Sequence, residues 1–329
     1  MSTDIDALSD GLKNGSIRSL AKALTLIESR LPEDRPRALA LLESIFPYRR
    51  PSQRIGISGS PGVGKSTFIE AFGQLFLKDG RRLAILAIDP TSPRSQGSIL
   101  GDKTRMEELA HHPACFIRPT PAGTSLGGVA RRTREAILLC EAAGFDTILV
   151  ETVGVGQSEH LVATMVDLFV YLTMPHSGDH LQGIKKGILE LADLIIVTKA
   201  DGDLMQAARR TAVDHEAALH FQRADPERMP NQVFLCSALE KTGLDVIYHS
   251  MQDTLARFAA ITAKRRLLQN QQWYRNELHD QLMDSLLEMP ALKQQMADMQ
   301  SKVDASEVPP PAAAKRLIDQ VIKRLSYGS

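Results

Sequence analysis

The sequence is poor in cysteine. Its 329 residues include three, Cys115, Cys140 and Cys236, and these lie far apart along the chain. A disulfide framework needs paired cysteines, and a cysteine metal cluster needs closely spaced ones. We therefore expect neither.

An excess of charge of one sign is also missing, because 39 lysines and arginines balance 39 aspartates and glutamates. This balance gives no sign of a nucleic-acid partner or of an anionic membrane surface. No apolar run reaches the length of about 18 residues that a membrane span needs. The first twenty residues contain Asp4, Asp6 and Asp10 and lack the pattern of a signal peptide. We expect a cytoplasmic protein that binds neither nucleic acid nor membrane.

The composition that remains, 43% apolar and 24% charged, is typical of a soluble chain with a substantial core. The sequence pattern divides the chain into an N-terminal helical segment (1–50), a central α/β domain (51–262) and a C-terminal helical arm (263–329). In the first segment, apolar residues at helical spacing over 20–27 and 39–45 predict two helices. The arm has helical spacing too, and its three prolines, Pro309 to Pro311, predict a stiff connector before a last helix, Ala313–Leu325. Such an arm docks either on its own domain or on a second copy.

The central segment alternates short apolar runs with longer amphipathic stretches. This pattern predicts a mostly parallel sheet flanked by helices, in which ligands bind at the carboxyl ends of the strands. The predicted strands are Ile55–Ser58, Leu83–Ile88, Cys115–Arg118, Thr147–Val150, Leu168–Thr173, Leu194–Val197 and Val233–Cys236.

A phosphate-binding loop follows the first of these strands and opens a helix. The pattern is formed by Gly59, Ser60, Pro61, Gly62, Val63, Gly64, Lys65, Ser66 and Thr67. Its glycines let the backbone wrap a phosphate chain, and the helix N-terminus favours negative charge. We expect Lys65 to reach the β- and γ-phosphates and Ser66 to hold Mg²⁺.

Carboxylates after two other strands are candidates for the metal site. Glu151 ends a buried strand, where it could orient either a Mg²⁺-bound water or the attacking water. Gly154, three residues later, can offer its N–H to the γ-phosphate. Asp89 and Asp102 could complete the metal's shell, although a turn-forming role is an open alternative for Asp102.

The choice of base is indicated by Thr198-Lys199-Ala200-Asp201 after the sixth strand. An aspartate there can accept two N–H groups of guanine, and adenine has no such pair. Thr198 replaces the commoner asparagine and keeps a hydroxyl. Ser237-Ala238-Leu239, after the next strand, fits the short element whose backbone contacts the base oxygen.

Four motifs together resemble the MeaB/ArgK/MMAA group of P-loop GTPases, and the resemblance covers nearly the whole chain. They lie at 89–92, 97–106, 151–159 and 178–188. The resemblance implies a GTP-hydrolysing chaperone of adenosylcobalamin-dependent methylmalonyl-CoA mutase, with GTP/GDP and Mg²⁺ as ligands and a homodimer built through the C-terminal arm. By position it assigns Asp89, Asp102 and Glu151 to the Mg²⁺ site. It assigns Asp179 and Lys185 to a switch that couples the partner to hydrolysis.

Two other functions are possible for a P-loop protein of this kind. A P-loop kinase or ATPase linked to arginine/ornithine transport would need an acceptor pocket and would have no use for a guanine motif. A metal-insertion GTPase usually carries a Cys- or His-rich tract, which this sequence lacks. The sequence does not choose an arginine for the transition state among Arg94, Arg105, Arg131, Arg132 and Arg134.

Overall fold

The computed structural model describes residues 2–88, 106–120, 126–152, 158–175, 186–220 and 227–327. The chain forms two compact units, Met1–Gln269 and Asn270–Ser329. In the described residues, no helix is both long enough and apolar enough to cross a membrane.

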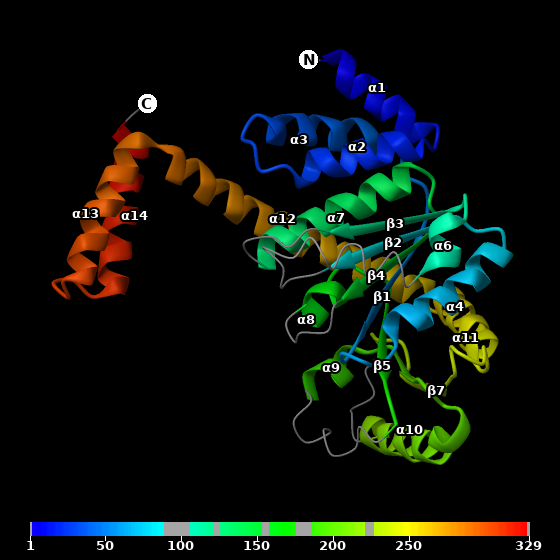
Figure 1. The fold of residues 1–329 in the computed structure, drawn as a ribbon. Coiled ribbons are helices and arrows are strands. Elements are labelled where there is room, and N and C mark those ends of the chain that lie inside the picture. Colours follow the sequence, from blue (N-terminus) through cyan, green and yellow to red (C-terminus); the bar gives the residue numbers. More distant parts are fainter. Residues whose placement is uncertain are drawn as a thin grey trace. The chain divides into compact units, whose positions relative to one another are not determined.

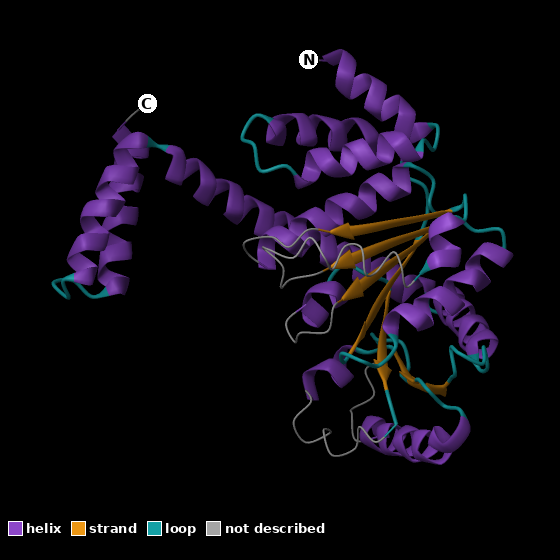
Figure 2. Ribbon diagram, in the orientation of Figure 1, coloured by secondary structure: helices purple, strands orange, loops and turns teal. Residues whose placement is uncertain are grey.

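A seven-stranded sheet forms the centre of the first unit, in the order β3-β2-β4-β1-β5-β6-β7. Every neighbouring pair is parallel, and Figure 2 shows the strands as orange arrows that fan out through the first unit. The predicted α/β fold with a parallel sheet is therefore confirmed. The strands are β1 (Gln53–Gly59), β2 (Leu83–Ile88), β3 (Cys115–Thr120), β4 (Thr147–Thr152), β5 (Leu168–Thr173), β6 (Leu194–Val197) and β7 (Gln232–Leu235).

Helices cover both faces of this sheet (Figure 1). One face carries α4 (Lys65–Lys78), α6 (Glu107–His111) and α11 (Leu244–Arg257). The other carries α7 (Leu126–Ala142), α8 (Ser158–Ala163) and α9 (Lys186–Leu191), and α10 (Met205–His220) packs on β6 and β7. The short helices α6 and α8 were not predicted, because five or six residues are too few to show a helical period.

The core on the α4 face is built around aromatic side chains spaced one turn apart. Phe68 stacks on Phe72 with ring centroids 5.0 Å apart, and Phe76 lies edge-on to Phe72 at 5.4 Å. Tyr248 of α11 closes the cluster, 5.0 Å from Phe76. This packing holds α4, and with it the loop before α4, firmly against the sheet.

Three N-terminal helices, α1 (Ser2–Lys13), α2 (Ile17–Glu28) and α3 (Asp34–Ile45), pack on one another and on α7. The sequence predicted α2 and α3 only. Helix α1 was missed because few of its residues are apolar, and of these Ile5 and Leu12 are buried.

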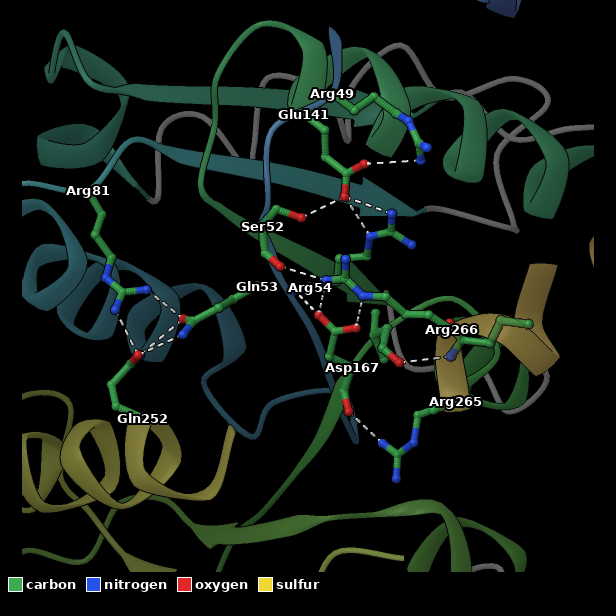
Figure 3. A network of polar contacts seen from close by, with 12 residues as sticks. Arg49, Ser52, Gln53, Arg54, Arg81, Glu141, Asp167, Gln252, Arg265 and Arg266 are labelled. Atoms are coloured by element: carbon green, nitrogen blue, oxygen red, sulfur yellow. Dashed lines mark hydrogen bonds and ion pairs between the residues drawn. The ribbon is translucent and has the colours of Figure 1, made fainter. Parts of the chain in front are cut away.

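At the amino ends of the strands, a network of arginines and carboxylates replaces apolar packing (Figure 3). Glu141 of α7 accepts hydrogen bonds from Arg54 Nε at 2.8 Å and from Ser52 Oγ at 2.6 Å. Asp167, immediately before β5, accepts the backbone N–H of Arg54 at 2.8 Å. The network therefore ties β1 to α7 and to the start of β5.

Two consecutive arginines of helix α12 (Ala259–Glu288) join the same network. Arg266 Nε donates to Asp167 Oδ1 at 2.6 Å. Arg265 binds both oxygens of Asp193, the residue before β6, at 2.8 and 2.9 Å. Asp167 and Asp193 are each 1% exposed, so the first turns of α12 neutralise buried charge at this edge of the sheet.

The second unit holds the rest of α12 together with α13 (Pro290–Asp304) and α14 (Pro310–Tyr327), which pack on each other. The sequence predicted that the prolines form a connector before the last helix. This was wrong, because Pro310 and Pro311 are the first residues of α14. Proline is accepted there because N–H groups of a helix's first turn have no partner within the helix. Several large apolar side chains of this unit are exposed: Tyr274, Leu278, Leu282, Met283, Met289, Ile318 and Ile322.

Candidate nucleotide-binding site

The predicted phosphate loop lies between the central strand β1 and α4. Gly62 and Gly64 adopt left-handed φ angles of 78° and 91°, which residues with a side chain adopt at a cost. At Gly59, a Cβ would lie 2.5 Å from the carbonyl oxygen of Leu172 in β5, so a side chain cannot enter there. The loop thus has the backbone that an anion cradle requires.

Positive charge gathers at this loop. Lys65 Nζ donates to the carbonyl oxygen of Gly59 at 2.7 Å and to that of Ser60 at 3.4 Å. The first N–H groups of α4 have no partner within the helix, and they point along its axis towards the loop. Together these groups suit a polyphosphate.

Glu151 lies beside the loop because β4 pairs with β1. The register places Glu151 opposite Ile57, two residues before Gly59, and the carboxylate is buried. The next pair of side chains is bonded directly, since Thr152 Oγ1 donates to Ser58 Oγ at 2.8 Å. A buried carboxylate therefore lies at the end of β4, on the strand next to the one that leads into the phosphate loop.

The loop after β6 is bonded to the phosphate loop by two side chains. Thr198 Oγ1 lies 2.7 Å from the carbonyl oxygen of Val63 and 3.1 Å from that of Thr173. Lys199, in a left-handed conformation with φ 54°, extends its Nζ to the carbonyl oxygen of Gly62 at 2.8 Å. The stretch predicted to recognise the base is thus adjacent to the phosphate loop, and the hydroxyl of Thr198 forms a hydrogen bond between the two.

Asp201, the residue predicted to select guanine, is hydrogen-bonded to a side chain of the loop after β7. Ser237 Oγ hydrogen-bonds Asp201 Oδ2, and it also accepts the N–H of Glu240 at 3.1 Å. Ala238 is half-buried, and Leu239 is 81% exposed. The hydroxyl of Ser237 therefore holds the carboxylate of Asp201, a contact that was not predicted from the sequence.

Several predicted site residues lie outside the described residues. They are Asp89, Asp102, Gly154, Asp179 and Lys185, together with the arginine candidates Arg94 and Arg105. Their roles stay predictions. Among the described residues, no group of three or more His, Cys, Asp or Glu side chains is placed to hold a metal ion.

Tyr171 of β5 is a neighbour of the phosphate loop that sequence reasoning missed. Burial raises the pKa of its phenol, a hydrogen bond with Ser60 opposes that shift, and the charge of Glu159 adds to it. Glu159 itself is buried at the start of α8. A tyrosine within the apolar run of β5 was the available signal, but apolar strands often contain one.

Two arginines of α7 have different surroundings. Arg134 Nη2 donates to Thr164 at 2.9 Å (Oγ1) and at 3.3 Å (carbonyl oxygen), which makes it part of the contact with the end of α8. Arg132 lies among the charges of Arg30, Glu28 and Glu135 instead.

Residues 20–291 match the family model described as methylmalonyl Co-A mutase-associated GTPase MeaB. The chain belongs to the MeaB family. It is 48% identical to a putative GTPase of Caulobacter vibrioides over 319 residues, which are 96% of this chain and 97% of the relative. It is 47% identical to the Escherichia coli GTPase ArgK over 84% of each chain.

A solved structure described as an LAO/AO transport system kinase has the same fold. It superposes with a TM-score of 0.75 at 35% identity and covers 98% of both chains. With family, fold and motifs in agreement, this MeaB-family protein is a GTPase that binds GTP.

Proposed function

We propose that this MeaB-family GTPase is a chaperone of adenosylcobalamin-dependent methylmalonyl-CoA mutase, and that its GTP hydrolysis gates cofactor loading, protection or reactivation of the mutase. The family description supports the partner. The observation that carries the nucleotide part is the pair of bonds from Thr198 and Lys199 to the phosphate loop. They join the elements that would hold the two ends of GTP.

In this proposal Lys65 and the backbone of the phosphate loop bind the β- and γ-phosphates. Asp201 accepts the two N–H groups of guanine, while the side-chain stem of Lys199 lies along the base. Ser237 orients Asp201, and Ala238 and Leu239 present their backbone to the base oxygen. Because Asp201 is a strong acceptor held in one orientation, adenine would leave it unpaired.

The residues present also fit Mg²⁺. Ser66 follows Lys65 in the first turn of α4, and the buried carboxylate of Glu151 lies opposite Ile57 on the next strand. Hard oxygen ligands of this kind, with waters and phosphate oxygens, are what Mg²⁺ prefers. When bound, the ion would neutralise charge on the phosphates. Asp89 and Asp102 are proposed to complete its shell.

We place the coupling to the partner at Asp179 and Lys185. The support is topological: these residues follow β5, which pairs with β1 beside the phosphate loop, and they precede α9. In this proposal the segment between β5 and α9 responds to the γ-phosphate and alters a partner-binding surface.

The test is GTP and ATP turnover with and without methylmalonyl-CoA mutase. The proposal expects GTP turnover that the mutase changes, little ATP turnover, and loss of turnover in Lys65→Ala. A matched control is Lys78→Ala, at the exposed end of the same helix, which should hydrolyse GTP normally. Equal turnover of the two nucleotides, or a rate that the mutase leaves unchanged, would favour the kinase or ATPase function that the transport-kinase name suggests.

We also propose that the second unit mediates a homodimer. The exposed apolar side chains of α12 and α14 support this, because a row of large apolar groups is costly in water. A chain ending after Gln269 keeps Arg265 and Arg266 with their buried carboxylates, so we expect a folded monomer in sedimentation. Leu278→Asp with Leu282→Asp in the full chain should also give monomers. Dimers in both variants would contradict the proposal.

A further inference from the structure

Hydroxyl side chains form a row across the neighbouring strands β4, β1 and β5, just before the loops of the nucleotide site. Thr152 Oγ1 of β4 donates to Ser58 Oγ of β1 at 2.8 Å, and Tyr171 of β5 lies opposite Ser58 in the register. Ser58 and Thr152 are completely buried, and Tyr171 is 5% exposed. Strands of a parallel sheet that is covered on both faces normally carry apolar side chains at such positions. These hydroxyls depend on protein partners for their hydrogen bonds, because water does not reach them.

The row and the carboxylate of Glu151 lie on opposite faces of the sheet. Helix α8 approaches Gly56, two residues before Ser58, so closely that a Cβ there would lie 2.6 Å from Val162 Cγ1. The row therefore faces α8. Glu151 precedes Thr152 and points to the other face, where its register partner belongs to the core cluster of α4. Because the two residues are consecutive, a contact that fixes Thr152 also fixes the backbone that carries Glu151.

The bond between Thr152 and Ser58 joins β4 and β1 where their backbone pairing stops. The last pair in their register is Ile57 with Glu151, and β1 ends two residues later at Gly59, the first residue of the phosphate loop. Loss of the Thr152 hydroxyl would deprive a completely buried hydroxyl of its donor, which is costly. The bond therefore helps to set the position of Glu151 relative to the start of the phosphate loop.

We propose that Thr152 is a positioning residue for GTP hydrolysis, which holds the carboxylate of Glu151 at the phosphate loop through its bond to Ser58. The inference rests on the role in the Mg²⁺ site that is proposed above for Glu151. Mg²⁺ keeps several waters and takes few protein ligands, so the placement of a single carboxylate matters for it. Small misplacements of a group that serves the reaction lower the rate steeply.

The test compares binding of a fluorescent, non-hydrolysable GTP analogue to the full chain in Mg²⁺ and in EDTA, together with GTP turnover. In Thr152→Val we expect the affinity gained from Mg²⁺ to fall at least about fivefold, and kcat to fall with it, because the buried bond is lost. Binding in EDTA should stay as in wild type, since the phosphate loop is intact. Thr152→Ser keeps the hydroxyl and should behave like wild type in both measurements.

Two comparisons separate positioning from a general loss of packing. Thr147 is a completely buried threonine at the other end of β4, and its hydroxyl bonds Asp146 at 3.3 Å. Whatever its effect on stability in urea unfolding, Thr147→Val should leave Mg²⁺-dependent binding and kcat unchanged. Ser58→Ala should reproduce the loss seen in Thr152→Val. The double variant should lose no more than either single variant, because all three lack the same bond.

The inference is overturned if Thr152→Val keeps the wild-type gain from Mg²⁺ and the wild-type kcat, if its binding weakens equally in EDTA, or if Thr147→Val loses as much. It is also overturned if the effects of Thr152→Val and Ser58→Ala multiply in the double variant, because the residues would then act separately. Glu151→Gln distinguishes this failure from that of the proposed metal site. If Glu151→Gln is impaired and Thr152→Val is not, the inference alone is wrong. If Glu151→Gln binds and hydrolyses like wild type, the metal assignment is wrong as well.

Discussion

At the scale of single residues, Thr198 decides how well the two halves of the nucleotide site fit together. Its hydroxyl lies between the carbonyl oxygen of Val63 in the phosphate loop and that of Thr173 at the end of β5. The side chain is buried, so a carbonyl that lost this donor would have no water to replace it. The substitution of asparagine by threonine at this position therefore keeps a bond between the base loop and the phosphate loop.

Removing that hydroxyl should weaken nucleotide binding. Thr198→Val keeps the shape and leaves the carbonyl of Val63 unbonded, at a cost of about 1–3 kcal/mol, or roughly five- to 150-fold in GDP affinity. Thr198→Ser retains the hydroxyl and is the control. Titration with a fluorescent GDP analogue measures both, and equal affinity of the valine variant would show that the bond is not needed.

His215 should make stability depend on pH. It is buried on α10, and neither ring nitrogen has a hydrogen-bond partner among the residues that the structure describes. Burial lowers its pKa below the ordinary 6.5, an effect that Asp214 partly opposes. Below about pH 6.5 the unfolded chain therefore takes up a proton that the folded chain resists, so stability falls as the pH falls, by at most about 1.4 kcal/mol per pH unit.

The check is urea unfolding between about pH 7 and pH 5. His215→Leu should flatten the loss of stability across this range. His220→Leu, at an exposed position on the same helix, should leave it as in wild type. A His215→Leu protein that loses stability as steeply as wild type would exclude this histidine as the cause.

Individual site residues were predictable from sequence where backbone geometry demands a residue type. Gly62, Gly64 and the Thr198–Asp201 stretch could be singled out because left-handed turns, and the recognition of guanine that we propose, restrict which residues can stand there. Tyr171 was not assigned a place, because its importance depends on which side chains surround it. That information comes only from tertiary packing.

At the scale of secondary-structure elements, the first turns of α12 bind the residues that precede two strands of the sheet. Arg265 and Arg266 neutralise Asp193 and Asp167, which precede β6 and β5. Each aspartate also accepts a backbone N–H, from Phe169 and Arg54 respectively. Breaking such a pair costs more than forming it gains, because one partner stays buried and charged.

Arg266→Ala should therefore destabilise the first unit by about 3–5 kcal/mol. The control lies two residues away on the same helix. Lys264 pairs with Glu227 in an exposed ion pair, so Lys264→Ala should change stability by no more than about 1 kcal/mol. Urea unfolding followed by circular dichroism compares the two, and similar stability of both variants would mean that the buried network contributes little.

Strands were easier to predict than short helices. The seven apolar runs all became strands, because a parallel sheet covered on both faces leaves little alternative for them. Helix α1 has few apolar residues, and α6 and α8 are short, so their periodicity is weak. The prolines at 309–311 led to an error of another kind. They predicted a break between helices, but Pro310 and Pro311 are the first residues of α14.

At the scale of the whole molecule, the sheet gathers the elements of the proposed nucleotide site at the carboxyl ends of its strands. Because the sheet is parallel, the carboxyl ends of β1, β4 and β6 lie on the same side of it. The phosphate loop, Glu151 and Asp201 lie at these ends. The Mg²⁺ shell, the switch residues Asp179 and Lys185, the domain boundaries at 50 and 262, the dimer and the cytoplasmic location stay predictions. The Mg²⁺ shell and the switch depend on the first premise, that the carboxyl ends of these strands hold GTP with its base at Asp201.

Exchange of base specificity tests that premise most directly. In Asp201→Asn the side chain keeps one acceptor and gains an N–H donor, which suits the 2-carbonyl of xanthine and not the 2-amino group of guanine. Measured by equilibrium binding to the full chain, GTP affinity should fall at least about a hundredfold while XTP affinity rises. An Asp201→Asn protein that binds GTP as tightly as wild type and does not bind XTP would contradict the account.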